Sequence, residues 1–119
     1  MTATEIEIPD YIARAKTVAD LARTAADLLE HAAGSGLPVP DMARLSTGGQ
    51  EVSFSFPGRK ETFRTLAQWA ERFGGTVTGE PYTRDDGEES VYCQARFPYL
   101  GASVEAYAFI PADQNVSST

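Results

Sequence analysis

Hydrophobic residues between Asp10 and Gly34 recur at spacings of three and four, the period of a helix that buries one face. The face is predicted to comprise Tyr11, Ala15, Val18, Ala22, Ala25, Leu29 and Ala32, widened by Leu21 and Leu28. Asp10 suits a helix start and Gly34 a helix end. At 1.5 Å per residue this helix would be about 36 Å long, the width of a compact domain of this size.

The pattern then changes to alternation, which predicts two strands at residues 42–46 and 51–56 around a turn at 47–50. Pairing Leu45 with Val52 brings Ala43 opposite Phe54, so both strands turn their apolar sides to one face. Residues 59–73 return to the helical period, and Gly74 is typical of the helix end. Its buried face is predicted to be Phe63, Leu66, Ala67, Ala70 and Phe73, with Trp69 at the margin but mostly buried between the helix and the sheet.

The last third of the chain alternates again, with a strand from residue 76, an acidic turn and a hairpin over 91–110. If the hairpin turns at 98–101, four pairs of small or apolar residues face the core. They are Phe97–Ala102, Ala95–Val104, Cys93–Ala106 and Val91–Ala108. The outward pairs become Tyr92–Tyr107, Gln94–Glu105 and Arg96–Ser103, with Phe109 beyond them. Pro81 cannot donate a ladder hydrogen bond, so its strand is predicted to be the outer one.

The predicted order is therefore α-β-β-α-β-β-β, an α+β fold whose antiparallel sheet has both helices packed on one face. The length of 119 residues fits a single domain over residues 1–119, and we expect residues 1–8 and 113–119 to be flexible.

The net charge of −7 lies mainly in the second half of the chain and disfavours direct binding of nucleic acid. The sequence has no apolar run of the roughly 20 residues that a membrane-spanning helix needs, and no signal-peptide pattern. The single cysteine excludes an internal disulfide. We therefore expect a cytoplasmic protein that does not bind membranes.

Motifs for catalysis, phosphate binding and metal binding are missing from the sequence, so we predict no catalytic residue, cofactor or metal ligand. Cys93 could be a thiol nucleophile with His31 as its base, but its inward strand position favours a buried small hydrophobe. The acidic run at 83–90 could bind Ca²⁺, but its spacing favours a solvated hairpin turn. Arg59 and Lys60 could hold an anion near a helix start, although Glu61 opposes this.

The outward side of the last hairpin is the candidate interaction surface, because aromatic residues on an open sheet face suit protein contacts. The residues of this surface and of the adjoining acidic turn are Tyr92, Arg96, Glu105, Tyr107, Phe109, Asp85, Asp86, Glu88 and Glu89.

Residues 50–111 contain the segments FRTLAQWAERFGGTVTGEPYTR and VYCQARFPYLGASVEAYAFIP. These resemble small acidic hypothetical proteins of actinomycetes and of their phages or integrated elements. The matching positions are Trp69, Ala70, Gly74, Gly75, Val77, Gly101, Val104 and Ala106. The resemblance brings no activity and no site residues, and it implies only an accessory role.

The leading hypothesis is a non-enzymatic protein-interaction module of bacterial or phage accessory type that forms a homodimer and binds a partner protein. One alternative is an acidic DNA mimic, of antirestriction or anti-CRISPR type, that blocks a host nucleic-acid-binding protein. Another alternative is a small-molecule-binding protein or enzyme with a pocket between the sheet and the helices.

Overall fold

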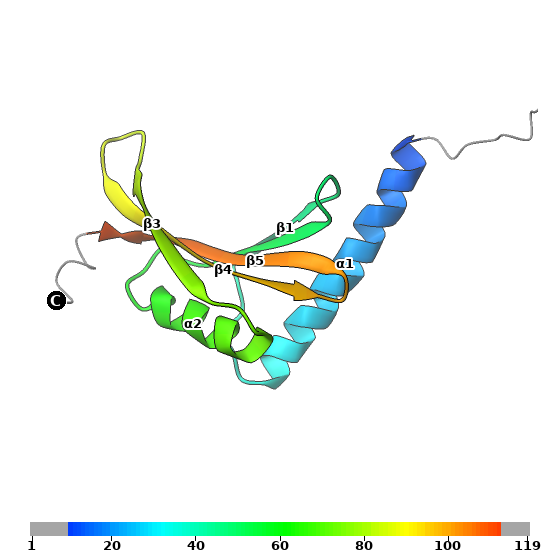
Figure 1. Ribbon diagram of the computed structural model, residues 1–119, viewed down its shortest axis with the longest axis horizontal. Coiled ribbons are helices and arrows are strands. Elements are labelled where there is room, and N and C mark those ends of the chain that lie inside the picture. The colour runs from blue at the N-terminus through cyan, green and yellow to red at the C-terminus, as the bar shows by residue number, and fades with distance from the viewer. Residues whose placement is uncertain (1–9, 113–119) are drawn as a thin grey trace, which may run out of the picture.

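The computed structural model describes residues 10–112, and it describes side chains from Thr17 onward. The expected flexible ends at 1–8 and 113–119 lie outside the described residues. The described residues form two helices and five strands in the predicted order, and Figure 1 shows how they are arranged. These elements are α1 (Asp10–Gly34), β1 (Met42–Ser46), β2 (Glu51–Ser55), α2 (Thr62–Phe73), β3 (Val77–Thr83), β4 (Glu89–Tyr99) and β5 (Ala102–Pro111).

The strands form one sheet in the order β1-β2-β5-β4-β3, so the strand latest in the sequence lies at the centre. The sheet is mostly antiparallel, as predicted, and departs from the prediction at one pair, because β2 and β5 run parallel. Parallel neighbours need a long crossover connection. The chain supplies it by passing through α2, β3 and β4 before it returns beside β2. As predicted, the Pro81 strand β3 is an edge strand.

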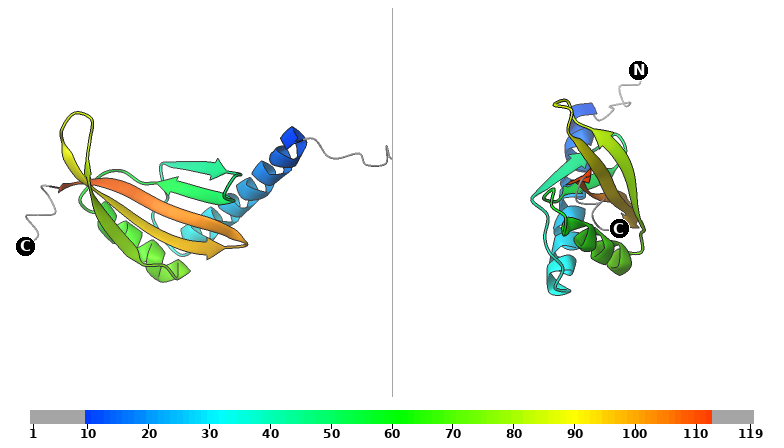
Figure 2. Two further views of the ribbon diagram at one scale, coloured as in Figure 1. Left: turned by 45° about the horizontal axis from the view of Figure 1, so that its top comes forward. Right: turned by 90° about the vertical axis from the view of Figure 1, so that its left-hand side faces the viewer.

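The helices cover one face of this sheet, and the other face is open on the side away from α2 (Figures 1 and 2). The helix α1 packs on β1 and β2, and α2 packs mainly on β4 and β5. The predicted pairs Leu45–Val52 and Ala43–Phe54 are both present between β1 and β2.

The β4–β5 hairpin has the predicted faces but a different register. Phe97 pairs with Val104, Cys93 with Ala108, and Tyr92 with Phe109, so every partner is displaced by two residues. The cause is a tighter turn, in which only Leu100 and Gly101 separate the paired residues Tyr99 and Ala102. Both turn residues have positive φ, 47° and 84°, as a type I′ turn requires. An even displacement leaves each side chain on its predicted face, because alternation has a period of two.

Trp69 fills the centre of the core and is fully buried, which confirms the prediction that it is buried between α2 and the sheet but not its place at the margin of the α2 face. Its ring lies 5.4 to 5.6 Å from the rings of Phe54, Phe56 and Phe73, and its indole N–H donates to the Pro38 carbonyl at 2.9 Å. The helix is rotated to bury this largest side chain, which leaves Phe63 51% exposed instead of buried as predicted.

The buried face of α1 is narrower than predicted. Among the side chains that the structure describes, from Thr17 onward, it consists of Leu21, Ala25, Leu28 and Ala32, all of which were predicted. The predicted Tyr11 and Ala15 lie outside the described side chains. Val18 is 41% exposed, and Ala22 is exposed too. The N-terminal turns of α1 extend beyond the sheet in Figures 1 and 2, so this part of the helix has no strand beneath it.

Candidate interaction surface

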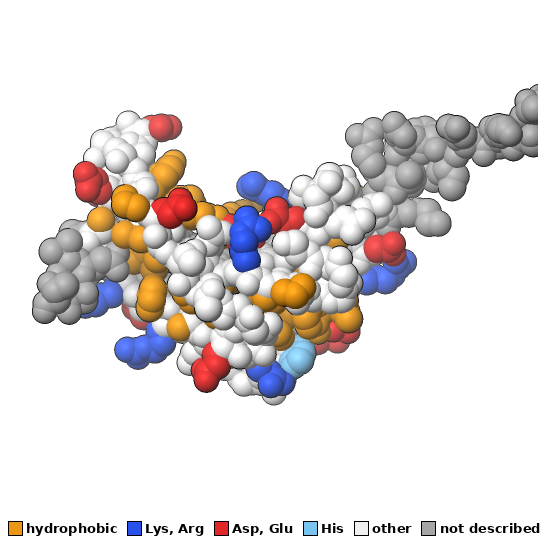
Figure 3. Space-filling view, viewed as in Figure 1, with side chains coloured by type: hydrophobic (Ala, Val, Ile, Leu, Met, Phe, Trp, Pro, Cys, Tyr) orange, Lys and Arg blue, Asp and Glu red, His pale blue; other side chains and the backbone are white. Residues whose placement is uncertain are grey.

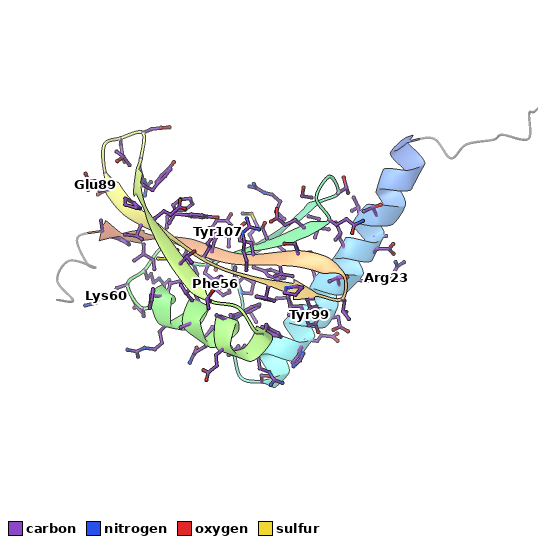
Figure 4. All side chains as sticks on the ribbon, in the orientation of Figure 1. Arg23, Phe56, Lys60, Glu89, Tyr99 and Tyr107 are labelled. Atoms are coloured by element: carbon purple, nitrogen blue, oxygen red, sulfur yellow. The ribbon has the colours of Figure 1, made fainter. Side chains whose placement is uncertain are left out.

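Four aromatic side chains gather on the sheet face opposite the helices, and we call them the aromatic face: Tyr82, Tyr92, Tyr107 and Phe109. They come from the adjacent strands β3, β4 and β5. The alternation of side chains along each strand points all four rings to the same face. The ring of Phe109 connects the other three. Its centroid lies 5.0 Å from the ring centroid of Tyr82, 5.1 Å from that of Tyr92 and 6.1 Å from that of Tyr107. Figure 4 shows Tyr107 above the sheet and Phe56 on the side of α2.

The sequence interpretation placed Tyr92 directly opposite Tyr107 and omitted Tyr82. The structure makes the first pair diagonal neighbours, still 5.8 Å apart between ring centroids. Tyr82 enters through the pairing of β3 with β4, and the outward alternation of Thr78, Glu80 and Tyr82 is the signal that would have found it.

A shallow groove of about 530 Å³ runs over the aromatic face. Its lining residues are Arg44, Ser53, Glu80, Pro81, Tyr82, Tyr92, Glu105, Tyr107 and Phe109. A second hollow of about 450 Å³ continues it toward the β3–β4 hairpin and adds Arg84, Asp85 and Asp86. Tyr82 and Phe109 line both hollows and so form the wall between them. Figure 3 shows apolar side chains at the base of this hairpin and acidic ones toward its tip.

Glu105 lies at the floor of the groove and is only 7% exposed, although the sequence placed it on the surface. The Tyr92 hydroxyl donates a hydrogen bond to its carboxyl group, and the Ser53 hydroxyl donates a longer one at 3.4 Å. Burial raises the pKa of Glu105, the nearby charge of Glu51 raises it further, and the hydrogen bond from Ser53 opposes the rise. The hydrogen bond to this carboxyl group therefore holds the Tyr92 ring in place.

Arg96 ties the polar end of this face together. Its Nη1 donates to Glu51 at 2.7 Å, its Nε donates to Gln94 at 3.1 Å, and its Nη2 lies 3.8 Å from Glu105. The structure pairs Arg96 directly with Glu105 across β4 and β5, where the sequence interpretation made them diagonal. Arg96 thus helps to hold Glu105 in place at the floor of the groove, and its own guanidinium is already paired with Glu51 and Gln94.

The acidic residues Asp85, Asp86, Glu88 and Glu89 are exposed in and beside the β3–β4 hairpin, as predicted. The Glu88 amide donates to the Asp86 carboxylate at 2.9 Å, and the Arg84 amide donates to the Glu88 carbonyl at 2.8 Å. These are the hydrogen bonds of a closed turn. Over residues 10–112, no group of three or more His, Cys, Asp or Glu side chains is placed to hold a metal ion.

The hypothetical Cys93–His31 pair does not form. Cys93 is buried in the core opposite Ala108, and burial raises the pKa of its thiol. His31 is exposed at the end of α1, where its Nε2 lies 2.7 Å from Arg72. The interpretation of Cys93 as a buried small hydrophobe is confirmed.

A separate polar cluster joins the end of α1 to the β4–β5 turn. The Tyr99 hydroxyl donates to Asp27 at 2.5 Å and lies 3.5 Å from Nδ1 of His31. The hydrogen bond to Asp27 is the main cause that raises the pKa of Tyr99 to about 12. In the segment before α2, Arg59 and Lys60 lie exposed beside Glu61. Neither cluster includes a residue of the aromatic face.

The space between the helices and the sheet, where one alternative hypothesis put a ligand pocket, is packed with fully buried side chains such as Trp69, Phe54 and Leu66. Within the part of the chain that the structure describes, no helix is long and apolar enough to cross a membrane. Comparisons of the chain with protein-family models, with curated proteins and with solved structures found no match.

Proposed function

We propose that this protein is a non-enzymatic interaction module that binds a partner protein through the aromatic face. The observation that supports this most directly is the exposure of two connected rings, Tyr82 at 44% and Phe109 at 38%, above an open groove. Aromatic side chains provide much of the binding energy of protein interfaces when a partner removes them from water.

The rigidity of the surface supports the same proposal. The aromatic face is built on three hydrogen-bonded strands, and the Glu105 carboxyl group holds Tyr92 in place. A surface that is already ordered loses less conformational entropy when it binds. The bacterial or phage accessory role that the sequence resemblance implies belongs to this proposal, as does assembly into a homodimer.

The acidic DNA mimic remains a second candidate, favoured by the four exposed carboxylates at the β3–β4 hairpin. Arg84 interrupts the negative charge within that hairpin, and Arg44 and Arg96 do so on the sheet face. Competition between this protein and duplex DNA for one bound partner would favour the DNA mimic.

The proposal is tested by capturing partners from a lysate of the source organism with the wild-type protein and with two variants. Phe109→Glu places a charge on the aromatic face, and Phe63→Glu places the same charge on an exposed phenylalanine of α2. We expect a partner that the wild type and Phe63→Glu retain and Phe109→Glu loses. Retention of the same partners by all three proteins would contradict the proposal.

A further inference from the structure

We propose that the aromatic face takes a basic segment of its partner, with an arginine or lysine side chain seated against Tyr82 and Phe109 and its charge opposite Glu80. This inference rests on the proposed function, and it specifies the chemistry of the partner.

The seat is formed by residues that the sheet places in adjacent rows. Phe109, Tyr92 and Glu80 lie in one row across β5, β4 and β3, because Tyr92 pairs with both of the others. Tyr82 is the next outward position on β3, and its ring centroid lies 5.0 Å from that of Phe109 at an interplanar angle of 49°. Two partly exposed rings thus line the same groove as one exposed acidic residue, Glu80.

This arrangement suits a cation on an alkyl stem. A guanidinium or ammonium group is attracted to the face of an aromatic ring, and the stem packs on apolar surface. The carboxylate of Glu80 would then supply the opposite charge at the end of the side chain. An apolar side chain in the same place would supply no positive charge to pair with the Glu80 carboxylate.

Charge complementarity extends beyond the seat. The groove continues past Tyr82 and Phe109 to Asp85 and Asp86, so further basic residues of the segment would meet carboxylates there. Of the arginines that line the groove, Arg44 borders only the first hollow and Arg84 only the second, so neither lies in the shared wall. A second copy of this chain, with its net charge of −7, would bring like charges together on this face.

The test is a titration of the ¹⁵N-labelled full-length protein with a synthetic peptide of alternating arginine and alanine, followed by backbone amide chemical shifts. A peptide of the same length with glutamine in place of arginine is the control ligand. We expect saturable shifts centred on Tyr82, Tyr92 and Phe109 with the arginine peptide and none with the glutamine peptide.

Two variants separate the cation–aromatic contact from general attraction to an acidic protein. Phe109→Leu keeps an apolar side chain but removes the ring, and Glu80→Gln removes the charge. Each is expected to weaken binding of the arginine peptide about tenfold. The matched control Phe63→Leu removes a ring from α2 and should bind like the wild type.

Three results would overturn the inference. They are shifts spread over the acidic surface with equal affinity for Phe109→Leu, equal binding of both peptides, and no saturable shift with the arginine peptide. Each of these leaves the proposed function standing, provided that Phe109→Glu still loses a captured partner. If Phe109→Glu retains every partner, the proposed function fails instead.

Discussion

At the residue scale, Glu105 combines a buried carboxyl group with a raised pKa on an otherwise open sheet face. Because the folded protein favours its protonated form, the stability that Glu105 contributes is fully present below the pKa it has in the unfolded chain. That contribution is lost as the pH rises through the higher pKa of the folded state.

Replacing Glu105 with glutamine should therefore reduce the loss of stability between acid and neutral pH. The amide of the introduced glutamine still offers Tyr92 an oxygen acceptor, so at neutral pH we expect Glu105→Gln to be at least as stable as the wild type. Denaturant titrations over a series of pH values measure this. A variant clearly less stable at neutral pH would show that the ionised carboxylate, with Arg96 nearby, stabilises the fold.

The thiol of Cys93 gives a second prediction at this scale. Burial raises its pKa and blocks access, so a thiol reagent at neutral pH should react slowly with the native protein and quickly once denaturant unfolds it. The rate of labelling in both conditions checks this. Rapid labelling of the native protein would revive a redox or nucleophilic role.

These two residues also show what alternation along a strand can predict. It identifies the face on which a side chain lies, and this was sufficient for Cys93, whose face is covered by the helices. It gave the correct face for Glu105 but not its burial, because that burial depends on which side chains of β2 and β4 lie beside it. Those neighbours follow from the parallel pairing of β2 with β5 and from the hairpin register.

At the scale of elements, α2 depends on Trp69, whose ring packs against Phe54 of β2 and against Phe56 just after that strand, and whose N–H donates to the Pro38 carbonyl. Truncation to alanine would leave a cavity and unpair the Pro38 carbonyl. We expect Trp69→Ala to lower the free energy of unfolding by about 3–5 kcal/mol in a denaturant titration. A loss below about 1 kcal/mol would be typical of a surface position.

The β4–β5 turn gives a prediction of the opposite sign. Leu100 has a φ of 47° and is exposed, so it holds a left-handed conformation without buried contacts to compensate. Asparagine tolerates this conformation better and precedes glycine in many type I′ turns. We expect Leu100→Asn to stabilise the protein by about 1 kcal/mol, measured by denaturant titration. Unchanged or lower stability would mean that Leu100 makes apolar contacts that outweigh the backbone strain.

All seven elements follow from the sequence because their hydrophobic periods are clear. The turn was placed too early because Leu100-Gly101 lacks the usual Asn-Gly signature, and this displaced every partner on β5. The predicted faces of α1 and α2 were only partly right for a related reason. A helical stripe several residues wide allows more than one orientation, and in α2 the observed one is that which buries Trp69.

At the scale of the whole molecule, two surfaces are candidates for self-association: the exposed side of α1 around Val18, and the aromatic face, where the like charges of a second copy count against it. We expect a dimer by light scattering at micromolar concentration, because a symmetric homodimer commonly covers such surfaces. Phe109→Glu should weaken it if the aromatic face is used, and Val18→Glu if α1 is used. Leu21 does not serve this purpose, since it is buried in the core and a charge there would unfold the protein.

A monomer mass at high protein concentration would contradict the dimer. It would also leave the aromatic face free for a foreign partner, in line with the inference that this partner is basic. A dimer weakened by Val18→Glu alone would be compatible with that inference too, because the aromatic face would then stay open in the assembly.

The central position of β5 has a consequence for synthesis on the ribosome. Every other helix and strand described here emerges before β5, yet β2 and β4 both pair with it. Until β5 emerges from the exit tunnel, the nascent chain carries two separate hairpins, each with an unpaired edge that could pair wrongly with other chains. The sheet can close only when this last strand is inserted between them. We therefore infer that this domain folds after translation of its final strand and not progressively during elongation.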